Sequence, residues 1–169
     1  MSQIMPWGTR LVWGCKGLLA LSVGAYMLLV GVDNVLYPGI NLTYVQHVLS
    51  MDELQPWVPP SIVDARAITS PLFHKLAFWL IVSVEIIVGS LCLVAGGLML
   101  VARTNRQFNC GKGVYFAGST LCLLLWFVGF FTIGAEWFVM WASPAVGVQM
   151  KSLTMALFVL LSMVLVAQR

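Results

Sequence analysis

The sequence predicts an all-α membrane protein, a compact four-helix transmembrane bundle, from three observations. The chain has 169 residues, of which 60% are hydrophobic and only 9% are charged, whereas soluble domains have about 25% charged residues. Its mean hydropathy is +0.95. Four stretches are long and apolar enough to cross the hydrocarbon core, which needs roughly 20 residues at about 1.5 Å each. The natural solvent of this chain is therefore a lipid bilayer.

The four predicted spans belong to a single domain that covers residues 1–169. They comprise residues 17–35, 76–101, 114–133 and 145–167, and a polar outer loop of residues 36–72 separates the first two. Ser70-Pro71 and Ser143-Pro144 each place an N-cap residue before a proline suited to the first helical position. The second and fourth helices should begin at these pairs, and the second should run on through Arg103.

Basic residues predict the orientation of the bundle. Six of them fall at one end of the four-span arrangement, where no acidic residue occurs, and the positive-inside rule makes that end cytoplasmic. These residues are Arg10, Lys16, Arg103, Arg106, Lys112 and Arg169. Both termini are therefore expected in the cytoplasm, with the polar loop outside.

Charge and cysteine content argue against two classes of protein. The formal net charge is +3, and the basic residues are scattered rather than gathered into a patch, so a nucleic-acid partner is not expected. Cys15, Cys92, Cys110 and Cys122 show neither a CxxC motif nor metal-type spacing. No disulfide framework is expected either.

Glu85 is the most informative residue because it lies near the middle of the second span. An ionised carboxylate there costs about 2.5 kcal/mol or more, so it should face the protein interior and find a partner, or be protonated. Gly89, Cys92 and Gly96 share its helix face, and small residues allow another helix to come close. Glu85 is thus either a buried hydrogen-bonding group or a site for a proton or an ion.

Lys151 is the expected intramembrane partner of Glu85. It lies about seven residues beyond Pro144, roughly 10 Å into the fourth span from the outer side. Contact with Glu85 requires the second and fourth spans to be neighbours. The alternative is that the Lys151 ammonium reaches the outer interface and stays in water.

Small residues predict packing seams on other spans. Glycines recur at intervals of seven in the first span, and a comparable face runs along the third. The two sets are Gly17, Gly24 and Gly31, and Gly118, Cys122, Leu125 and Gly129.

The outer loop is predicted to be structured. A short interfacial helix over about residues 43–51, capped by Asn41 or Thr43, would carry an apolar stripe at helical spacing. The stripe consists of Tyr44, Val45, Val48 and Leu49.

Polar residues of the outer end are candidates for a common site. His47 and His74 are the only histidines, and two His could bind a haem axially, or a metal together with Asp52 or Glu136. Ordinary hydrogen bonds are the alternative, and no cofactor is expected. Trp137, beside Glu136, fits an aromatic belt at the interface.

These outer residues are also expected to converge. We predict one polar site, in which Arg66 could pair with an acidic partner. Its members are His47, Asp52, Arg66, His74 and Glu136.

Several segments resemble a family of bacterial small integral membrane proteins of unknown function. The resemblance covers nearly the whole chain and rests on TYVQHVLSMD (residues 43–52), Arg66-Ala67, His74, Glu85 and GAEWFVMWAS (residues 134–143). The chain departs from the family pattern at Ala135, Ala142 and Ala145-Val146-Gly147. The resemblance implies four spans in a bacterial inner membrane and supplies no activity.

The sequence carries no complete catalytic motif, so association is the favoured function. We expect an accessory, assembly or regulatory subunit that works by contact with other membrane proteins or by self-association, and not an enzyme. The alternatives are a small oligomeric transporter or channel, proton-coupled through Glu85, and a haem- or metal-binding protein that uses His47 and His74.

Overall fold

A computed structural model describes residues 7–144 and 149–168 of the chain. Within these residues four apolar helices are long enough to cross a membrane, as predicted, and no strand occurs. They are α1 (Trp7–Leu36), α4 (Pro71–Val101), α5 (Asn105–Leu123) continued by η1 (Leu124–Trp137), and α6 (Gln149–Ala167). The described part of the chain is therefore an all-α bundle.

The helix boundaries differ from the predicted spans mainly at the polar ends. The first helix begins at Trp7 rather than near residue 17, because its basic first turns remain helical beyond the apolar part. Ser70 caps α4 as predicted, with its hydroxyl accepting from the Phe73 amide at 3.5 Å. However, α4 ends at Val101 and not beyond Arg103. The predicted start of the fourth helix after Pro144 falls on residues 145–148, outside the described residues.

The third membrane helix, α5, starts at Asn105, well before the predicted residue 114, because a capping box stabilises its N-terminus. The Thr104 hydroxyl accepts from the Gln107 amide at 3.3 Å, and the Gln107 side chain accepts from the Thr104 amide at 3.2 Å. This reciprocal arrangement satisfies two amides that the first helical turn leaves without partners. Arg106 and Lys112 therefore lie on the helix and not in a loop.

The predicted glycine seam of the first helix is the contact between α1 and α4. A Cβ added at Gly24 would lie 2.6 Å from the Leu93 amide nitrogen, and one at Gly89 would lie 2.6 Å from that of Leu28. Gly17 and Gly96 approach each other in the same way. Only glycine allows two backbones this close, so the small residues on the Glu85 face pack as predicted.

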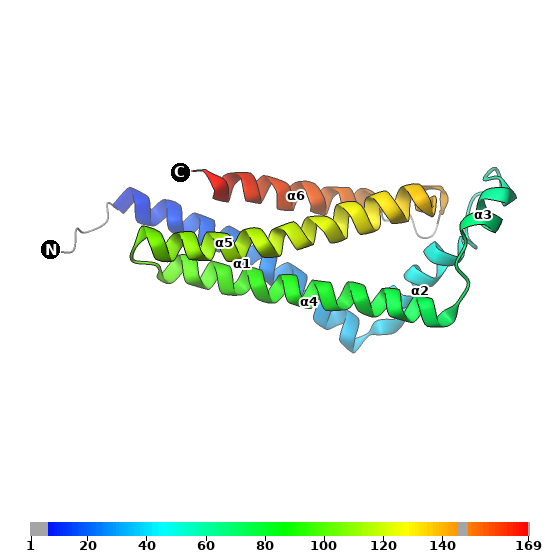
Figure 1. Ribbon diagram of the computed structural model, residues 1–169, viewed down its shortest axis with the longest axis horizontal. Coiled ribbons are helices and arrows are strands. Elements are labelled where there is room, and N and C mark those ends of the chain that lie inside the picture. The colour runs from blue at the N-terminus through cyan, green and yellow to red at the C-terminus, as the bar shows by residue number, and fades with distance from the viewer. Residues whose placement is uncertain (1–6, 145–148, 169) are drawn as a thin grey trace.

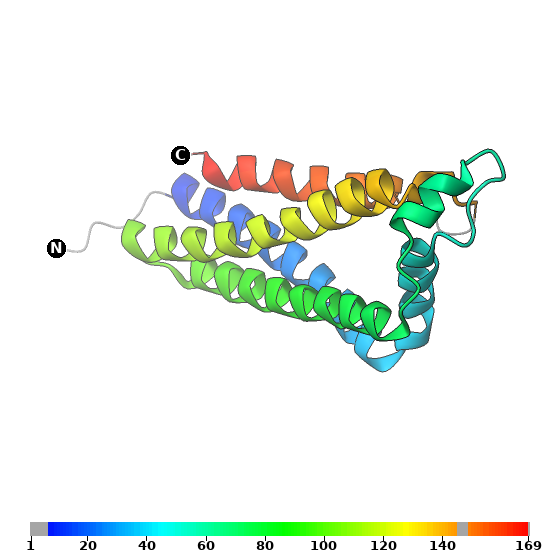
Figure 2. The ribbon, with the colours of Figure 1, turned by 45° about the vertical axis from the view of Figure 1, so that its right-hand side comes forward.

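The described helices converge at one end and separate at the other (Figure 1, Figure 2). The N-terminal end of α1, the junction of α4 with α5 and the C-terminal end of α6 lie together at the basic end (Figure 1). Toward the opposite end, α5 and η1 diverge from α4, and α2 lies across the gap between them (Figure 2). Because the number of spans is even, both ends of the described chain lie on the same side of the bundle.

The loop between α1 and α4 is structured, as predicted, and forms a headpiece. We use this name for α2 (Pro38–Ser50), α3 (Pro60–Arg66) and η2 (Met140–Ala142) with their connections. The predicted caps are wrong, because α2 begins at Pro38 and the Thr43 hydroxyl instead donates to the Gly39 carbonyl at 2.7 Å. Proline fits the first helical turn without any side-chain cap.

Two left-handed turns meet in the core of the headpiece. Met51 and Val139 have φ of 54° and 53°, a conformation that costs a β-branched residue such as Val139 particularly much. Both pack in one apolar cluster with Phe138 and Ala142. The Gln55 amide also donates to the Ala142 carbonyl at 3.0 Å. Tertiary packing therefore holds the end of η1 against α2 and α3.

Candidate functional site

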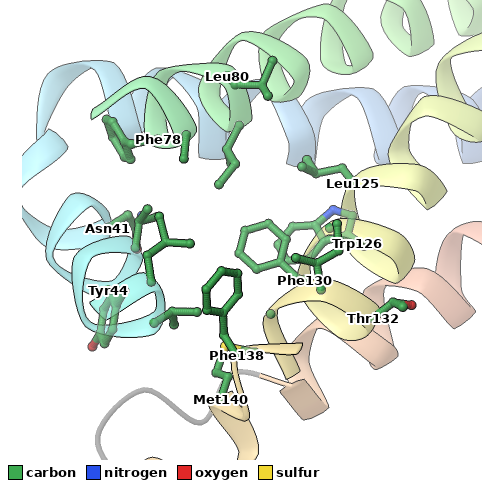
Figure 3. Close-up of a pocket in the computed structure, with 18 of the residues that line it drawn as sticks. Asn41, Tyr44, Phe78, Leu80, Leu125, Trp126, Phe130, Thr132, Phe138 and Met140 are labelled. Atoms are coloured by element: carbon green, nitrogen blue, oxygen red, sulfur yellow. The ribbon is translucent and has the colours of Figure 1, made fainter. Parts of the chain in front are cut away.

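A cavity of about 1030 Å³ occupies the space between the separating helices. This volume lies at the upper end of the roughly 300–1,000 Å³ typical of small-molecule sites. The lining comes from α1, α2, α4 and η1, with contributions from α3, η2 and α6. Most lining side chains are aliphatic or aromatic, and Phe78 from α4 faces Trp126, Phe130 and Phe138 across it (Figure 3). The cavity is therefore suited to a mainly apolar molecule.

The wall formed by η1 owes its shape to π-helical backbone. The Phe138 amide donates to the Ile133 carbonyl, five residues earlier, at 3.1 Å. The wider turn stacks aromatic rings four residues apart, with the Trp126 and Phe130 centroids 5.0 Å apart. Gly129 leaves the wall open, because an added Cβ would meet nothing closer than 3.8 Å. Such segments are rare and often mark functional sites.

Glu85 faces this cavity from α4, and its side chain is buried, with 2% of the residue exposed. Its Oε2 accepts a hydrogen bond from Asn34 Nδ2 on α1 at 2.7 Å. The prediction that Glu85 points into the bundle agrees with this position. No basic nitrogen lies within 4.0 Å of it in the described residues, so the predicted contact with Lys151 does not form.

A chain of amides extends from Glu85 to the headpiece. Asn41 Nδ2 on α2 donates to Asn34 Oδ1 at 2.5 Å, and Asn34 is itself only 3% exposed. Because Asn41 occupies the carbonyl oxygen of Asn34, the amide nitrogen of Asn34 is directed at Glu85. Three helices thus meet at one polar strip in an otherwise apolar wall.

The second polar part of the lining consists of charged residues near the headpiece. Arg66, Glu136 and Lys151 all border the cavity, but Arg66 pairs with neither Asp52 nor Glu136. Its Nη1 donates to the Trp137 carbonyl at 3.0 Å, and its guanidinium lies 4.7 Å from the centroid of the Trp137 ring. A cation over an aromatic face is a favourable contact, and it orients Trp137.

The two histidines serve separate contacts within the headpiece end. His74 is buried, and its Nε2 bonds to the Ile68 carbonyl at 2.6 Å. His47 Nδ1 lies 2.9 Å from Asp52 Oδ1 and 3.6 Å from Glu53 Oε1. The hydrogen bond to Asp52 raises the pKa of His47, burial opposes this, and the charges of Asp52 and Glu53 add to the rise.

The predicted outer cluster is therefore divided into three contacts. Its members gather at the headpiece end, where Met51 packs with Phe138, yet His47 pairs with Asp52, Arg66 with Trp137 and His74 with Ile68. Among the described residues no three His, Cys, Asp or Glu side chains gather as metal ligands. Both histidine rings have protein partners.

Sequence reasoning did not identify Asn34 and Asn41 as site residues. One signal pointed to Asn34, which follows Gly31 by three positions and so continues the glycine face of α1 toward α4. Asn41 was assigned to a helix cap instead. Its position seven residues from Asn34 became informative only when the chain was seen to reverse at Pro38 between the two helices.

A scan against protein families matches residues 13–169 to the family described as predicted small integral membrane protein (DUF2165). The match agrees with the resemblance seen in the sequence. Neither the curated proteins nor the solved structures contain a significant match. Ala145, Val146 and Gly147, where the sequence departs from the family pattern, lie outside the described residues.

Proposed function

The chain belongs to this family of predicted small integral membrane proteins, and on that premise we propose that it binds an amphipathic molecule of the lipid class within the bilayer. The observation that carries the proposal is the cavity between α4 and η1. Its volume of about 1030 Å³ and its apolar lining suit such a ligand. Both flanking helices are membrane spans, so an opening between them admits molecules sideways from the bilayer.

The mouth of the cavity supports lateral entry. Leu80 on α4 and Ile133 on η1 line the cavity and are also 66% and 47% exposed. Exposed aliphatic residues at membrane depth face acyl chains. A lipid-class molecule can therefore pass between these helices while its apolar part stays out of water.

Photolabelling tests this proposal. A diazirine-bearing C16 amphiphile should label peptides of α4 and η1 in the protein reconstituted in nanodiscs. Gly129→Leu should reduce this labelling by roughly fivefold or more, because the added side chain projects from the open wall and occupies cavity space that the bound probe needs.

Gly97→Leu is the matched control for Gly129→Leu. Gly97 lies on α4 with no atom within 4 Å of an added Cβ, and it does not line the cavity. Its labelling should equal that of the wild type. Labelling distributed evenly over all lipid-facing helices, unchanged by Gly129→Leu, would overturn the proposal.

Association with another membrane protein is the second candidate function, favoured by exposed aromatic residues on the headpiece. Trp57 and Trp141 are 61% and 46% exposed, and their ring centroids lie 5.5 Å apart. Tryptophan is enriched among residues that dominate interfaces. A pulldown in mild detergent with mass spectrometry should lose its partners in the double variant Trp57→Ala/Trp141→Ala. Trp7→Ala, which alters an exposed tryptophan at the basic end, should retain them.

The finer localisation follows from the charges. We propose a bacterial inner membrane, as the resemblance to the family implies, and an orientation with both termini in the cytoplasm, because Arg10, Arg103 and Arg106 lie at the basic end. A cysteine placed near Trp57 should react with an impermeant reagent in intact cells. One placed near Asn105 should react only after the inner face is opened, and the reverse pattern would overturn this orientation.

A further inference from the structure

Glu85 has more hydrogen-bonding capacity than the protein uses. Within the described residues Asn34 is the one donor to its carboxyl group, and it reaches Oε2. Oε1 accepts no hydrogen bond from the described residues, and it is not fully enclosed by protein. A buried carboxyl group with an oxygen open to a cavity is a point where a ligand can bond.

The amide strip fixes the Glu85 carboxyl group in the cavity wall. Asn34 is fixed from one side by Asn41 and bonds to Glu85 on the other, so Oε2 is occupied and Oε1 is left for a ligand. Glu85 and both asparagines line the cavity. The strip is therefore a built polar site in an apolar wall.

The surroundings of Glu85 determine which head group fits. No cation of the described chain lies within 4.0 Å to balance a second negative charge, so a phosphate head is disfavoured beside it. A charged head would also have to leave the interface for membrane depth, at far greater cost than an uncharged one. A hydroxyl both donates and accepts, so it complements a carboxyl group in either protonation state.

We propose that Glu85, held by Asn34 and Asn41, recognises the hydroxyl of a neutral long-chain alcohol bound in the cavity. This inference rests on the proposed function and names the ligand class. The hydroxyl bonds to the free oxygen of Glu85, while the apolar chain lies among Phe78, Trp126 and their neighbours. Isoprenoid alcohols, fatty alcohols and quinols share this chemistry.

Three probes that share the same alkyl chain test the inference. A diazirine-bearing C16 alcohol, its methyl ether and its phosphate monoester differ only at the head. In wild-type protein in nanodiscs at alkaline pH, where an ionised carboxylate only accepts hydrogen bonds, the alcohol should label the cavity about tenfold more than the ether, because the ether cannot donate to Glu85. The phosphate should label no better than the ether. Equal labelling by alcohol and ether, or preference for the phosphate, would overturn the inference.

Variants of Glu85 extend the test. Glu85→Met should label equally with alcohol and ether. Glu85→Gln should also lose most of the preference, because its amide oxygen accepts from Asn34 and the amide nitrogen left for the ligand can donate to either probe. A preference undiminished in Glu85→Met would also overturn the inference. The head-group series needs only the wild type, so it stands even if a variant does not fold.

The outcomes separate this inference from the function it rests on. If the probes label the cavity and Gly129→Leu blocks them but head groups are not distinguished, only the inference fails. If no probe labels the cavity above the lipid-facing surface, the proposed function fails as well.

Discussion

Both ends of this bundle are built from apolar residues, but the helices pack closely toward one end and enclose a cavity at the other. From Gly17 near the basic end to Gly31, glycines hold the backbones of α1 and α4 together, and at the basic end Trp13 also stacks on Phe108 with centroids 4.3 Å apart. At the headpiece end, aromatic residues surround a cavity of about 1030 Å³. Helix packing in lipid depends on close contact, since lipid is as apolar as the side chains. The seam between α1 and α4, with the contacts of the basic end, therefore holds the bundle together, and the space between α4 and η1 at the headpiece end is left open to bind.

The last helix illustrates the same division. At the basic end, Lys16 Nζ donates to the Gln168 carbonyl at 2.5 Å and Lys112 Nζ to the Ala167 carbonyl at 3.1 Å. Within the bundle, Tyr115 bonds to Ser162. Toward the headpiece, α6 packs on η1, and Lys151 is exposed beside the cavity. These three bonds all lie in the C-terminal half of α6 or just beyond it.

The largest effect is expected from closing the contact between α1 and α4. Gly24→Leu places a side chain where a Cβ alone would lie 2.6 Å from the Leu93 nitrogen, so the helices must separate. We expect a loss of about 3 kcal/mol or more in free energy of unfolding, measured by thermal unfolding in detergent. Gly97→Leu has no such contact and should change stability little. If both variants were equally stable, the seam between α1 and α4 would not be what holds the bundle.

The next effect concerns the polar strip of the open end. Glu85→Ala leaves Asn34 buried without its acceptor and should cost about 1–3 kcal/mol. Glu85→Gln keeps the shape and an acceptor, so its stability should be near that of the wild type. Equilibrium unfolding in detergent gives the comparison. A transport function coupled to protonation would instead appear as normal stability of Glu85→Gln with loss of pH-dependent flux in liposomes.

A smaller effect is expected at the basic end of α6. Lys16→Met removes one cation from the C-terminal carbonyls of that helix, where basic groups stabilise by about 0.3–1 kcal/mol. Hydrogen exchange of α6 should rise near Gln168 and remain unchanged near Gln149. Lys112→Gln should act in the same direction. Uniform loosening of α6 would show that the lysines do more than hold its last turn.

The smallest effect is a pH dependence of the headpiece. The Asp52 bond raises the pKa of folded His47 above its ordinary 6.5. The stabilisation is therefore complete below that ordinary value and is lost as the pH rises through the folded pKa. Thermal unfolding followed by tryptophan fluorescence should show the headpiece weakening over this range. His47→Gln should abolish the dependence without altering the contact between α1 and α4.

Local sequence patterns were sufficient to predict the membrane helices. Apolar length predicted four spans, Ser70-Pro71 predicted the start of α4, and the interval of seven predicted the glycine face of α1. These features depend on residues a few positions apart. The Thr104 and Gln107 capping box was equally local but was overlooked, so α5 was placed too late.

The side chains that Glu85 and Arg66 contact could not be predicted from the sequence. Glu85 was matched with Lys151 by charge, but α4 packs against α1 and α5, which places Asn34 beside Glu85. Arg66 was matched with an acid and instead contacts Trp137. In both pairs the outcome depends on which helices are neighbours and how they are rotated.

The sequence by itself determined that the chain is a membrane bundle with one tight helix seam and a buried carboxyl group. Only the tertiary structure decided that the helices separate toward the headpiece and that Glu85, Asn34 and Asn41 share a cavity wall. The physical reason is that burial and helix formation follow from local composition. A cavity instead depends on the relative positions of α1, α2, α4 and η1, whose lining residues are far apart in the sequence.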